Sequence, residues 1–266
     1  MYYGCVFKAK KEIPAQLSMP TKDPGSDHFG TLSIIIPVYN ERQTVMPLLQ
    51  QVARQPVPLR KELIIVDDCS TDGTREFLQQ ADLLTLVGNS GQNVVKLALH
   101  DKNQGKGAGV RTGLAQATGE IVLIQDADLE YDPGDYPLLL TPILKGHADA
   151  VFGNRFHSGP HRVQRYWRYV LNRIFSIICN SLTGLAIHDV TACYKVFTRD
   201  LLERMHLHSD RFSVETEMTV KAAKLGARIY EVPIVYHGRT YAEGKKISWH
   251  DGWKALYDLI RYRFKD

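Results

Sequence analysis

Two pairs of carboxylates follow short apolar runs of the sequence. Asp67 and Asp68 end one run, and Asp126 and Asp128, separated by one alanine, end another. Carboxylates this close repel each other unless a cation lies between them, and oxygen ligands of this kind suit Mg²⁺ or Mn²⁺. Mg²⁺ often takes only one or two carboxylates and completes its shell with substrate phosphates. The spacing leaves two interpretations, a divalent-metal site or a solvated turn whose aspartate caps the next helix.

A glycine-rich segment, NQGKGAG at 103–109, precedes an apolar pattern typical of a helix. Backbone N–H groups of such a loop could bind a phosphate. The segment lacks the GxGxxG fingerprint, because Val110 stands where the third glycine would be, and it lacks the GK[ST] of a P-loop. Asp126 nevertheless follows by about 20 residues, as in dinucleotide-binding proteins. A phosphate cradle, a dinucleotide-dependent oxidoreductase and tight packing of the loop are therefore all open interpretations.

The stretch 155–173 is basic and aromatic, with five arginines, four aromatic residues and no acidic residue. Arginine suits two-point binding of phosphate oxygens. A solvated helix face would have the same composition, and a nucleic-acid site would need a longer basic stripe and a recognisable module. An apolar stretch follows at 174–187, and the segment 249–264 again combines basic residues with an apolar helical stripe. This combination favours contact with an anionic lipid surface, with core packing as the alternative for the second segment.

The elements that must position these residues alternate along the first half of the chain. Short β-branched runs, typical of strands buried on both faces of a parallel sheet, occupy 32–38, 62–68, 94–100 and 120–128. Helical periodicity covers 45–52, 71–81 and 107–117. The alternation predicts an α/β fold with a Rossmann-like, doubly wound, mostly parallel sheet, whose ligands bind beyond the carboxyl ends of the strands.

The second half of the chain is predicted to be mainly helical. Helical patterns cover 163–182, 213–225 and 249–263, and short strands are expected near 193–197 and 228–236. No repeat or linker divides the chain. We therefore expect an N-terminal arm over 1–30, rich in proline and glycine, and one domain over 31–266 that ends in an amphipathic helix.

Composition excludes several classes of protein. Of 266 residues, 44% are hydrophobic and 23% are charged, which excludes wholesale disorder. Four cysteines without CxxC or Cys/His spacing argue against a disulfide scaffold and a structural zinc site. The sequence begins without the apolar core of a signal peptide, and the most apolar run, 170–187, is interrupted by Arg173 and two asparagines. We expect a cytoplasmic protein in peripheral contact with a membrane.

Nine motifs, in order, resemble those of family 2 glycosyltransferases with the GT-A fold. The resemblance runs from about 32 to 263 and is strongest to the synthases that make dolichol- or polyprenyl-phosphate mannose or glucose. The motifs are PVYNE at 37–41, VDDCSTDG at 66–73, NQGKG at 103–107, DADLE at 126–130, GNR at 153–155, WR at 167–168 with Asn172, DVTACYK at 189–195, ETE at 215–217 and HGRT at 237–240. Each alone is weak, but the ordered set is specific.

The resemblance implies a role for each matching residue. The residues implied to bind the nucleotide-sugar donor are Pro37, Tyr39, Glu41, Val66, Asp68, Lys106 and Asp126. Asp126 and Asp128 would hold Mg²⁺ or Mn²⁺, with Glu130 as a third ligand where the family often has glutamine. Arg155, Arg168 and Arg239 resemble phosphate-facing arginines, and Asp189 is the family's candidate for a general base. Cys69 stands where the family usually has a glycine.

The implied reaction is an inverting transfer of mannose or glucose from GDP-mannose or a UDP-hexose. A hydroxyl acceptor would need a general base such as Asp189, whereas a phosphate is already largely ionised at neutral pH and needs cations instead. The arginines therefore favour polyprenyl or dolichyl phosphate at the cytosolic membrane face, with a membrane protein as an expected partner and no nucleic acid. The alternatives are a family 2 enzyme with a saccharide acceptor, an NAD(P)-dependent oxidoreductase and a nucleic-acid binder.

Overall fold

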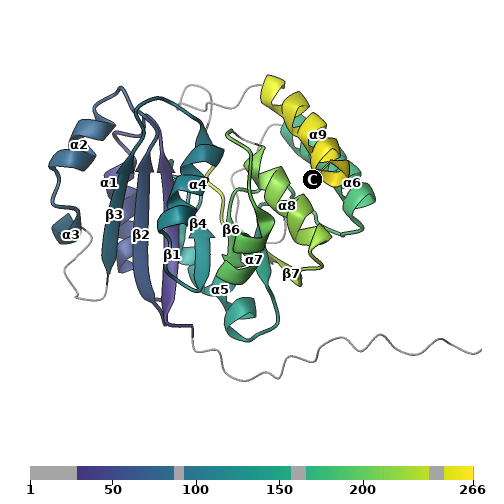
Figure 1. Ribbon diagram of the computed structural model, residues 1–266, viewed down its shortest axis with the longest axis horizontal. Coiled ribbons are helices and arrows are strands. Elements are labelled where there is room, and N and C mark those ends of the chain that lie inside the picture. The colour runs from purple at the N-terminus through teal and green to yellow at the C-terminus, as the bar shows by residue number, and fades with distance from the viewer. Residues whose placement is uncertain (1–28, 87–92, 157–165, 212, 240–248, 266) are drawn as a thin grey trace, which may run out of the picture.

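The computed structural model describes residues 29–86, 93–156, 166–211, 213–239 and 249–265 (Figure 1). The arm expected over 1–30 lies outside the described residues, except for 29 and 30. Among the helices of the described ranges, none has the length and apolar character needed to cross a bilayer.

One twisted sheet runs through the centre of the molecule. In the described ranges its strands lie in the order β3-β2-β1-β4-β6-β5-β7. They are β1 (Thr31–Val38), β2 (Arg60–Asp67), β3 (Val94–Leu99), β4 (Ile121–Ile124), β5 (Ala150–Asn154), β6 (Lys195–Thr198) and β7 (Ile229–Pro233). β6 is antiparallel to β4 and β5, and the other neighbours are parallel. Strands from both halves of the chain therefore build one mostly parallel sheet.

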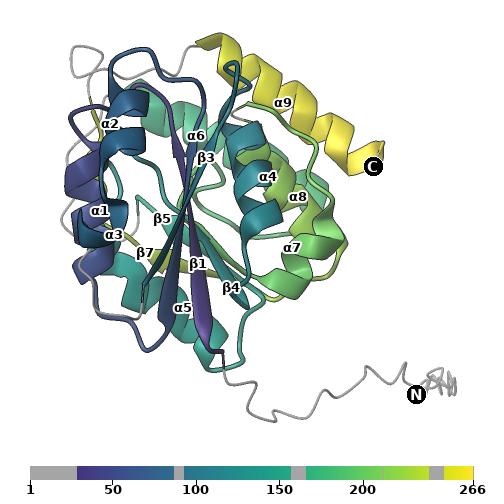
Figure 2. The same cartoon turned by 60° about the vertical axis from the view of Figure 1, so that its left-hand side comes forward.

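Helices cover both faces of this sheet. The described helices are α1 (Val45–Arg54), α2 (Thr74–Gln80), α3 (Leu83–Leu86), α4 (Lys106–Gln116), the 3₁₀ turn η1 (Pro133–Asp135), α5 (Tyr136–Leu144), α6 (Tyr166–Thr183), α7 (Arg199–Met205), α8 (Val214–Lys224) and α9 (Trp249–Phe264). Figure 2 shows α1 and α5 on one side and α4, α7 and α8 on the other. α6, α8 and α9 pack together on that second side.

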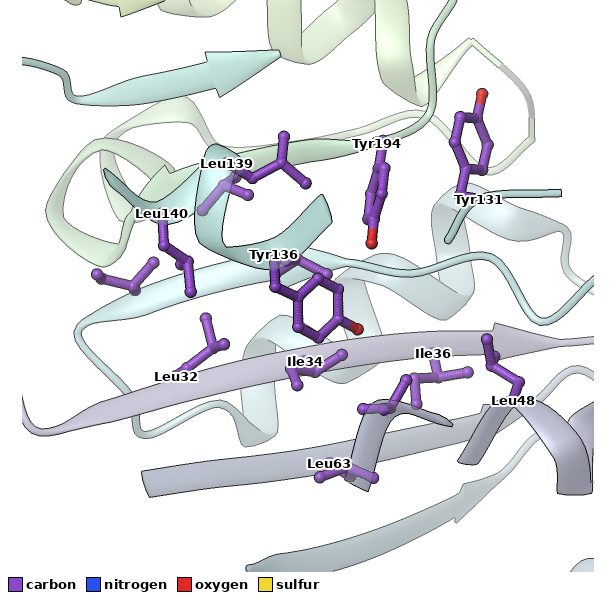
Figure 3. Close-up of a cluster of buried hydrophobic side chains, with 14 of the residues drawn as sticks. Leu32, Ile34, Ile36, Leu48, Leu63, Tyr131, Tyr136, Leu139, Leu140 and Tyr194 are labelled. Atoms are coloured by element: carbon purple, nitrogen blue, oxygen red, sulfur yellow. The ribbon is translucent and has the colours of Figure 1, made fainter. Parts of the chain in front are cut away.

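The apolar strands are buried on both faces because alternate side chains enter different cores. Ile34 and Ile36 of β1 belong to the core under α1 and α5, whereas Ile35 belongs to the core under α4 and α8. In the first core, Tyr136 and Leu139 of α5 pack over β1 (Figure 3). Each fully buried side chain of this size contributes about 1.5–3 kcal/mol. The two cores fix the sheet and hence the positions of the loops that follow its strands.

The predicted α/β architecture is confirmed, with shifts of a few residues at the element ends. The expected helices at 71–81, 107–117 and 213–225 are α2, α4 and α8, and the expected strands at 193–197 and 228–236 are β6 and β7. The sequence patterns did not indicate α5, β5 or α7. The C-terminal half is mainly helical as expected, and its two expected strands join the central sheet, β6 between β4 and β5 and β7 next to β5.

Candidate active site

The candidate site lies where β1, β2 and β4 end at the same edge of the sheet. Each of the loops that follow these strands holds a non-glycine residue with positive φ, namely Asn40 at 52°, Cys69 at 61° and Leu129 at 61°. Such backbone is uncommon outside glycine and often occurs at functional sites. At Cys69 it explains why the related motif usually has a glycine. The turns place the acidic residues of the three loops next to one another.

The first carboxylate, that of Asp68, is held by the glycine-rich loop. It accepts hydrogen bonds from the backbone N–H groups of Gln104 (2.8 Å) and Gly105 (2.7 Å), and it contacts the His100 ring nitrogen at 2.8 Å. Its side chain is 5% exposed. Two of the N–H groups that a phosphate cradle would need are therefore already engaged by this carboxylate.

The glycines of this loop serve close packing against the segment before α8. Ala108 N–H donates to the Asp210 carbonyl at 3.0 Å. A Cβ atom on Gly105 would lie 2.5 Å from that same carbonyl oxygen, and one on Gly107 would overlap the backbone of Ser209. The geometry therefore supports the packing interpretation of the glycines. It gives no support to the dinucleotide-binding interpretation, in which the same glycines would serve phosphate binding.

Lys106 links the fourth strand to α8. Its Nζ lies 2.5 Å from an Asp126 carboxylate oxygen and 2.7 Å from a Glu215 oxygen. Burial alone would lower the pKa of Lys106, but the negative charges of Asp126 and Glu215 raise it well above its usual value. The ammonium is therefore a permanent cation at Asp126. Glu215 belongs to the ETE motif at 215–217, but the sequence pattern predicted no role for it.

Arg239 provides the second cation of the carboxylate cluster. Its guanidinium lies 3.0 Å from Asp128 Oδ2 and makes two hydrogen bonds to Glu41, at 3.1 and 3.2 Å. Burial, together with the negative charges of Asp126 and Glu130, raises the pKa of Asp128 to about 7, although the charge of Arg239 lowers it. The site holds more negative charge at Asp128 than its own cations neutralise.

This donor set fits a divalent cation. Asp126 and Asp128 offer hard carboxylate oxygens, and protein cations lie against both of them. Within the described residues, no three His, Cys, Asp or Glu side chains converge as a metal cage. Two carboxylates, completed by phosphate oxygens, are a usual arrangement for Mg²⁺. Glu130 as a third ligand stays a prediction, since its oxygens accept from Tyr236 (2.7 Å) and from Arg239 N–H (2.6 Å).

A second cluster surrounds Arg155, directly after β5. Its Nε and Nη2 each lie 2.7 Å from one oxygen of Asp189, and Nη2 also donates to Thr191 at 2.7 Å. The Asp189 side chain is fully buried, and that of Arg155 is 12% exposed. Burial alone would lower the pKa of Arg155, but the charge of Asp189 raises it well above its usual value. Asp189 therefore orients an arginine in this arrangement, which argues against its acting as a general base.

Tyr236 joins the two clusters, and nothing in the sequence pattern indicated it. Its hydroxyl donates to Glu130 at 2.7 Å, and its ring centroid lies 5.1 Å from the Arg155 guanidinium carbon. An antiparallel bridge to Tyr131 fixes its backbone beside the loop after β4. Tyr236 and Glu130 are more than one hundred residues apart in the sequence, so the spacing of residues within a motif does not reveal their contact.

The remaining predicted residues differ in their surroundings. Tyr39 is 37% exposed after β1, and Pro37, within β1, lies against Gly109 of α4. Val66 is fully buried between β1 and β3, so its contact with the donor stays a prediction. Arg168 lies in the first turn of α6, beside the exposed Trp167. The last residue of the HGRT motif, at position 240, lies outside the described residues.

Comparison with known proteins agrees with this geometry. Residues 33–205 match the family model described as glycosyl transferase family 2. Glycosyltransferase AglJ of Haloferax volcanii is 31% identical over 226 residues, which cover 83% of this chain and 65% of AglJ. Dodecaprenyl-phosphate galacturonate synthase of Rhizobium johnstonii is 26% identical over 235 residues, 88% of this chain and 66% of that protein. The chain thus spans about two thirds of the length of these curated relatives.

Solved structures share the fold. Glucosyl-3-phosphoglycerate synthase from Mycobacterium tuberculosis, in complex with Mn²⁺, UDP and glucosyl-3-phosphoglycerate, superimposes with a TM-score of 0.64 at 19% identity. The match covers 88% of this chain and 78% of that one. The predicted GT-A fold is confirmed.

Proposed function

The chain belongs to glycosyltransferase family 2, and from this premise we propose that it transfers a sugar from a nucleotide-sugar to the phosphate of a polyprenyl phosphate. The observation that carries the proposal is the adjacency of two charged clusters. Asp126, Asp128 and Glu130 form one, and Arg155 forms the other. Tyr236 contacts Glu130 of the first cluster and Arg155 of the second. A metal-binding carboxylate pair beside a buried arginine suits a reaction between two phosphate-bearing substrates.

On the donor side, Pro37, Tyr39, Glu41 and Asp68 would contact the base and ribose, and Lys106 would act beside the diphosphate. Asp126 and Asp128 would hold Mg²⁺ or Mn²⁺, which when bound offsets charge on the departing diphosphate. Relatives of the chain are named for different sugars, including galacturonate and 4-deoxy-4-formamido-L-arabinose. A donor of GDP-mannose or a UDP-hexose is our finer proposal.

On the acceptor side, residues of the chain would bind the phosphate anion of the acceptor. Arg155 is oriented by Asp189, and Arg168 and Arg239 would add positive charge around the acceptor phosphate. A phosphate oxygen then attacks the anomeric carbon from the face opposite the leaving diphosphate, so the configuration inverts. No base is required, because the attacking oxygen carries no proton at neutral pH.

The surface of α6 and α9 supports peripheral membrane contact. Exposed apolar side chains recur along both helices, and they are Tyr166, Trp167, Leu171, Ile174, Ile177, Tyr257, Ile260 and Phe264. Arg168, Arg173, Arg261 and Arg263 lie between them in sequence. Such a surface is typical of contact with anionic lipid. A saccharide acceptor gains no support from it, since a soluble acceptor requires no exposed apolar helix surface.

We propose the cytoplasmic membrane face as the place of action, with one domain over 31–266 and a membrane protein as a further partner. A flotation assay with vesicles containing anionic lipid tests the contact. Wild-type protein should float, and a Trp167→Ala/Ile174→Ser variant should stay in solution. Equal flotation of Leu84→Ser, which changes an exposed leucine of α3, serves as the matched control.

A donor panel tests the reaction itself. The protein is incubated with Mn²⁺ or Mg²⁺, a polyprenyl phosphate in detergent and one of GDP-mannose, UDP-glucose, UDP-GlcNAc or UDP-galactose. Mass spectrometry of the organic phase should detect a glycosylated lipid phosphate with one donor, and none with Asp128→Asn. Metal-dependent release of nucleoside diphosphate without a lipid product would contradict the acceptor and favour a saccharide.

A further inference from the structure

One guanidinium serves three carboxylates at the edge of the donor site. Arg239 Nη2 lies 3.0 Å from Asp128 and 3.1 Å from Glu41, and its Nη1 lies 3.2 Å from the other Glu41 oxygen. Its Nε is 4.0 Å from a Glu130 oxygen, and this nitrogen is buried without a hydrogen-bond partner. The guanidinium is therefore placed to neutralise the charge of all three carboxylates, although its Nε makes no hydrogen bond.

The backbone that carries Arg239 is fixed independently of its side chain. His237 N–H donates to the Glu130 carbonyl at 2.8 Å, and Arg239 N–H donates to the Glu130 carboxylate at 2.6 Å. Tyr236 contacts the same carboxylate. Glu130 therefore anchors the main chain of 236–239, and the guanidinium could leave Asp128 by rotation of its side chain alone.

A bound cation and this guanidinium would compete for the same oxygens. Asp128 Oδ2 is the oxygen that Arg239 contacts, and Asp128 is also a ligand in the proposed metal site. Two cations cannot both take close positions on one carboxylate oxygen without strong repulsion. This repulsion favours retreat of the arginine when a divalent cation and a nucleotide bind.

We propose that Arg239 is a resident counter-cation of the donor site. It pairs with Glu41 and Asp128 while the site lacks donor, and the divalent cation with its nucleotide displaces it. From its anchored backbone the released guanidinium then becomes available to a substrate phosphate, so donor binding precedes acceptor binding. This inference rests on the proposed metal-dependent transfer.

The test is a titration of the protein with Mn²⁺ at saturating nucleoside diphosphate (GDP or UDP) and without acceptor, because phosphate oxygens complete the proposed metal site. A protein-free blank with the same nucleotide is subtracted. Free Mn²⁺ is measured by electron paramagnetic resonance at a mildly alkaline pH, where carboxylates are ionised. Arg239→Gln is compared with the wild type and with Arg228→Gln, which removes an exposed arginine paired to Asp149 away from the site. A charge within about 4–6 Å shifts the proton affinity of a carboxylate by 1–3 units. Arg239→Gln should therefore bind Mn²⁺ at least about tenfold more tightly.

Arg228→Gln should match the wild type. Arg239→Lys, which keeps the charge but cannot reach Glu41 and Asp128 with the same two-pronged geometry, should fall between wild type and Arg239→Gln. It also keeps the test available if the glutamine variant does not fold. Equal or weaker Mn²⁺ binding by the Arg239 variants would overturn the inference while leaving the metal site intact. No Mn²⁺ binding by any of the proteins would contradict the metal site as well.

Discussion

Gly107→Ala tests whether the glycines of the 103–109 loop are required for close packing against the segment before α8. A Cβ atom at this position would lie 2.8 Å from the carbonyl carbon of Ser209 and 3.0 Å from that of Asp210. Both are backbone atoms, so no side-chain rotation can relieve the overlap. The loop and the segment before α8 must separate, which also strains the bond from Ala108 N–H to Asp210.

The backbone overlap and the strained hydrogen bond both lower the stability of the variant. Overpacking of this kind costs about 1–3 kcal/mol, and a lost backbone hydrogen bond costs about 1 kcal/mol. We therefore expect the free energy of unfolding to fall by about 2–4 kcal/mol. In a protein of this size each kcal/mol lowers Tm by about 2–4 °C.

Urea unfolding followed by circular dichroism measures this change. Gly30→Ala is the matched control, because its nearest neighbour would be a Glu120 side-chain oxygen at 3.9 Å and its φ is not in the left-handed region. The control should unfold like the wild type. A Gly107→Ala protein of wild-type stability that had lost donor binding would refute the packing argument and restore the phosphate cradle.

Three further outcomes are expected. Burial raises the pKa of Glu62, but hydrogen bonds from Lys96, Ser33 and Thr118 outweigh it and lower the pKa to about 2. The stability that depends on this charge is complete above about pH 4.5 and is lost as the pH falls towards 2, so Glu62→Gln should flatten acid unfolding in this window. Asp189→Asn should reduce kcat/KM for the lipid acceptor at least about tenfold without changing donor affinity, measured by steady-state kinetics, and an unchanged value would exclude the orienting role. Arg168→Ala should lower turnover with a lipid phosphate, and full turnover would remove Arg168 from the acceptor site.

The sequence predicted the parts of the site that follow directly from single strands. Asp68, Asp126 and Asp128 come at the ends of continuous apolar runs, and such runs are strong signals for buried parallel strands. Their convergence follows from the topology rule that ligands bind at the carboxyl ends of strands. The position of these carboxylates at one edge of the sheet could therefore be predicted from the sequence.

Partners brought in from distant segments could not be predicted in this way. Glu215 reaches Lys106 because α8 packs beside α4, and Tyr236 reaches Glu130 through a bridge to the loop after β4. Neither contact leaves a periodic or local signature. The role of Asp189 also changed once its two oxygens were seen to bind Arg155, since a sequence shows which residue is acidic but not what neutralises it.

The most direct test of the account compares two acceptors that differ only in the phosphate. The protein is given Mn²⁺, the active nucleotide-sugar and either a polyprenyl phosphate or the matching polyprenol, and the lipid products are identified by mass spectrometry. We predict a glycosylated product from the phosphate alone, lost in EDTA and restored by Mn²⁺. A product from the polyprenol, or an undiminished product in EDTA, would contradict it.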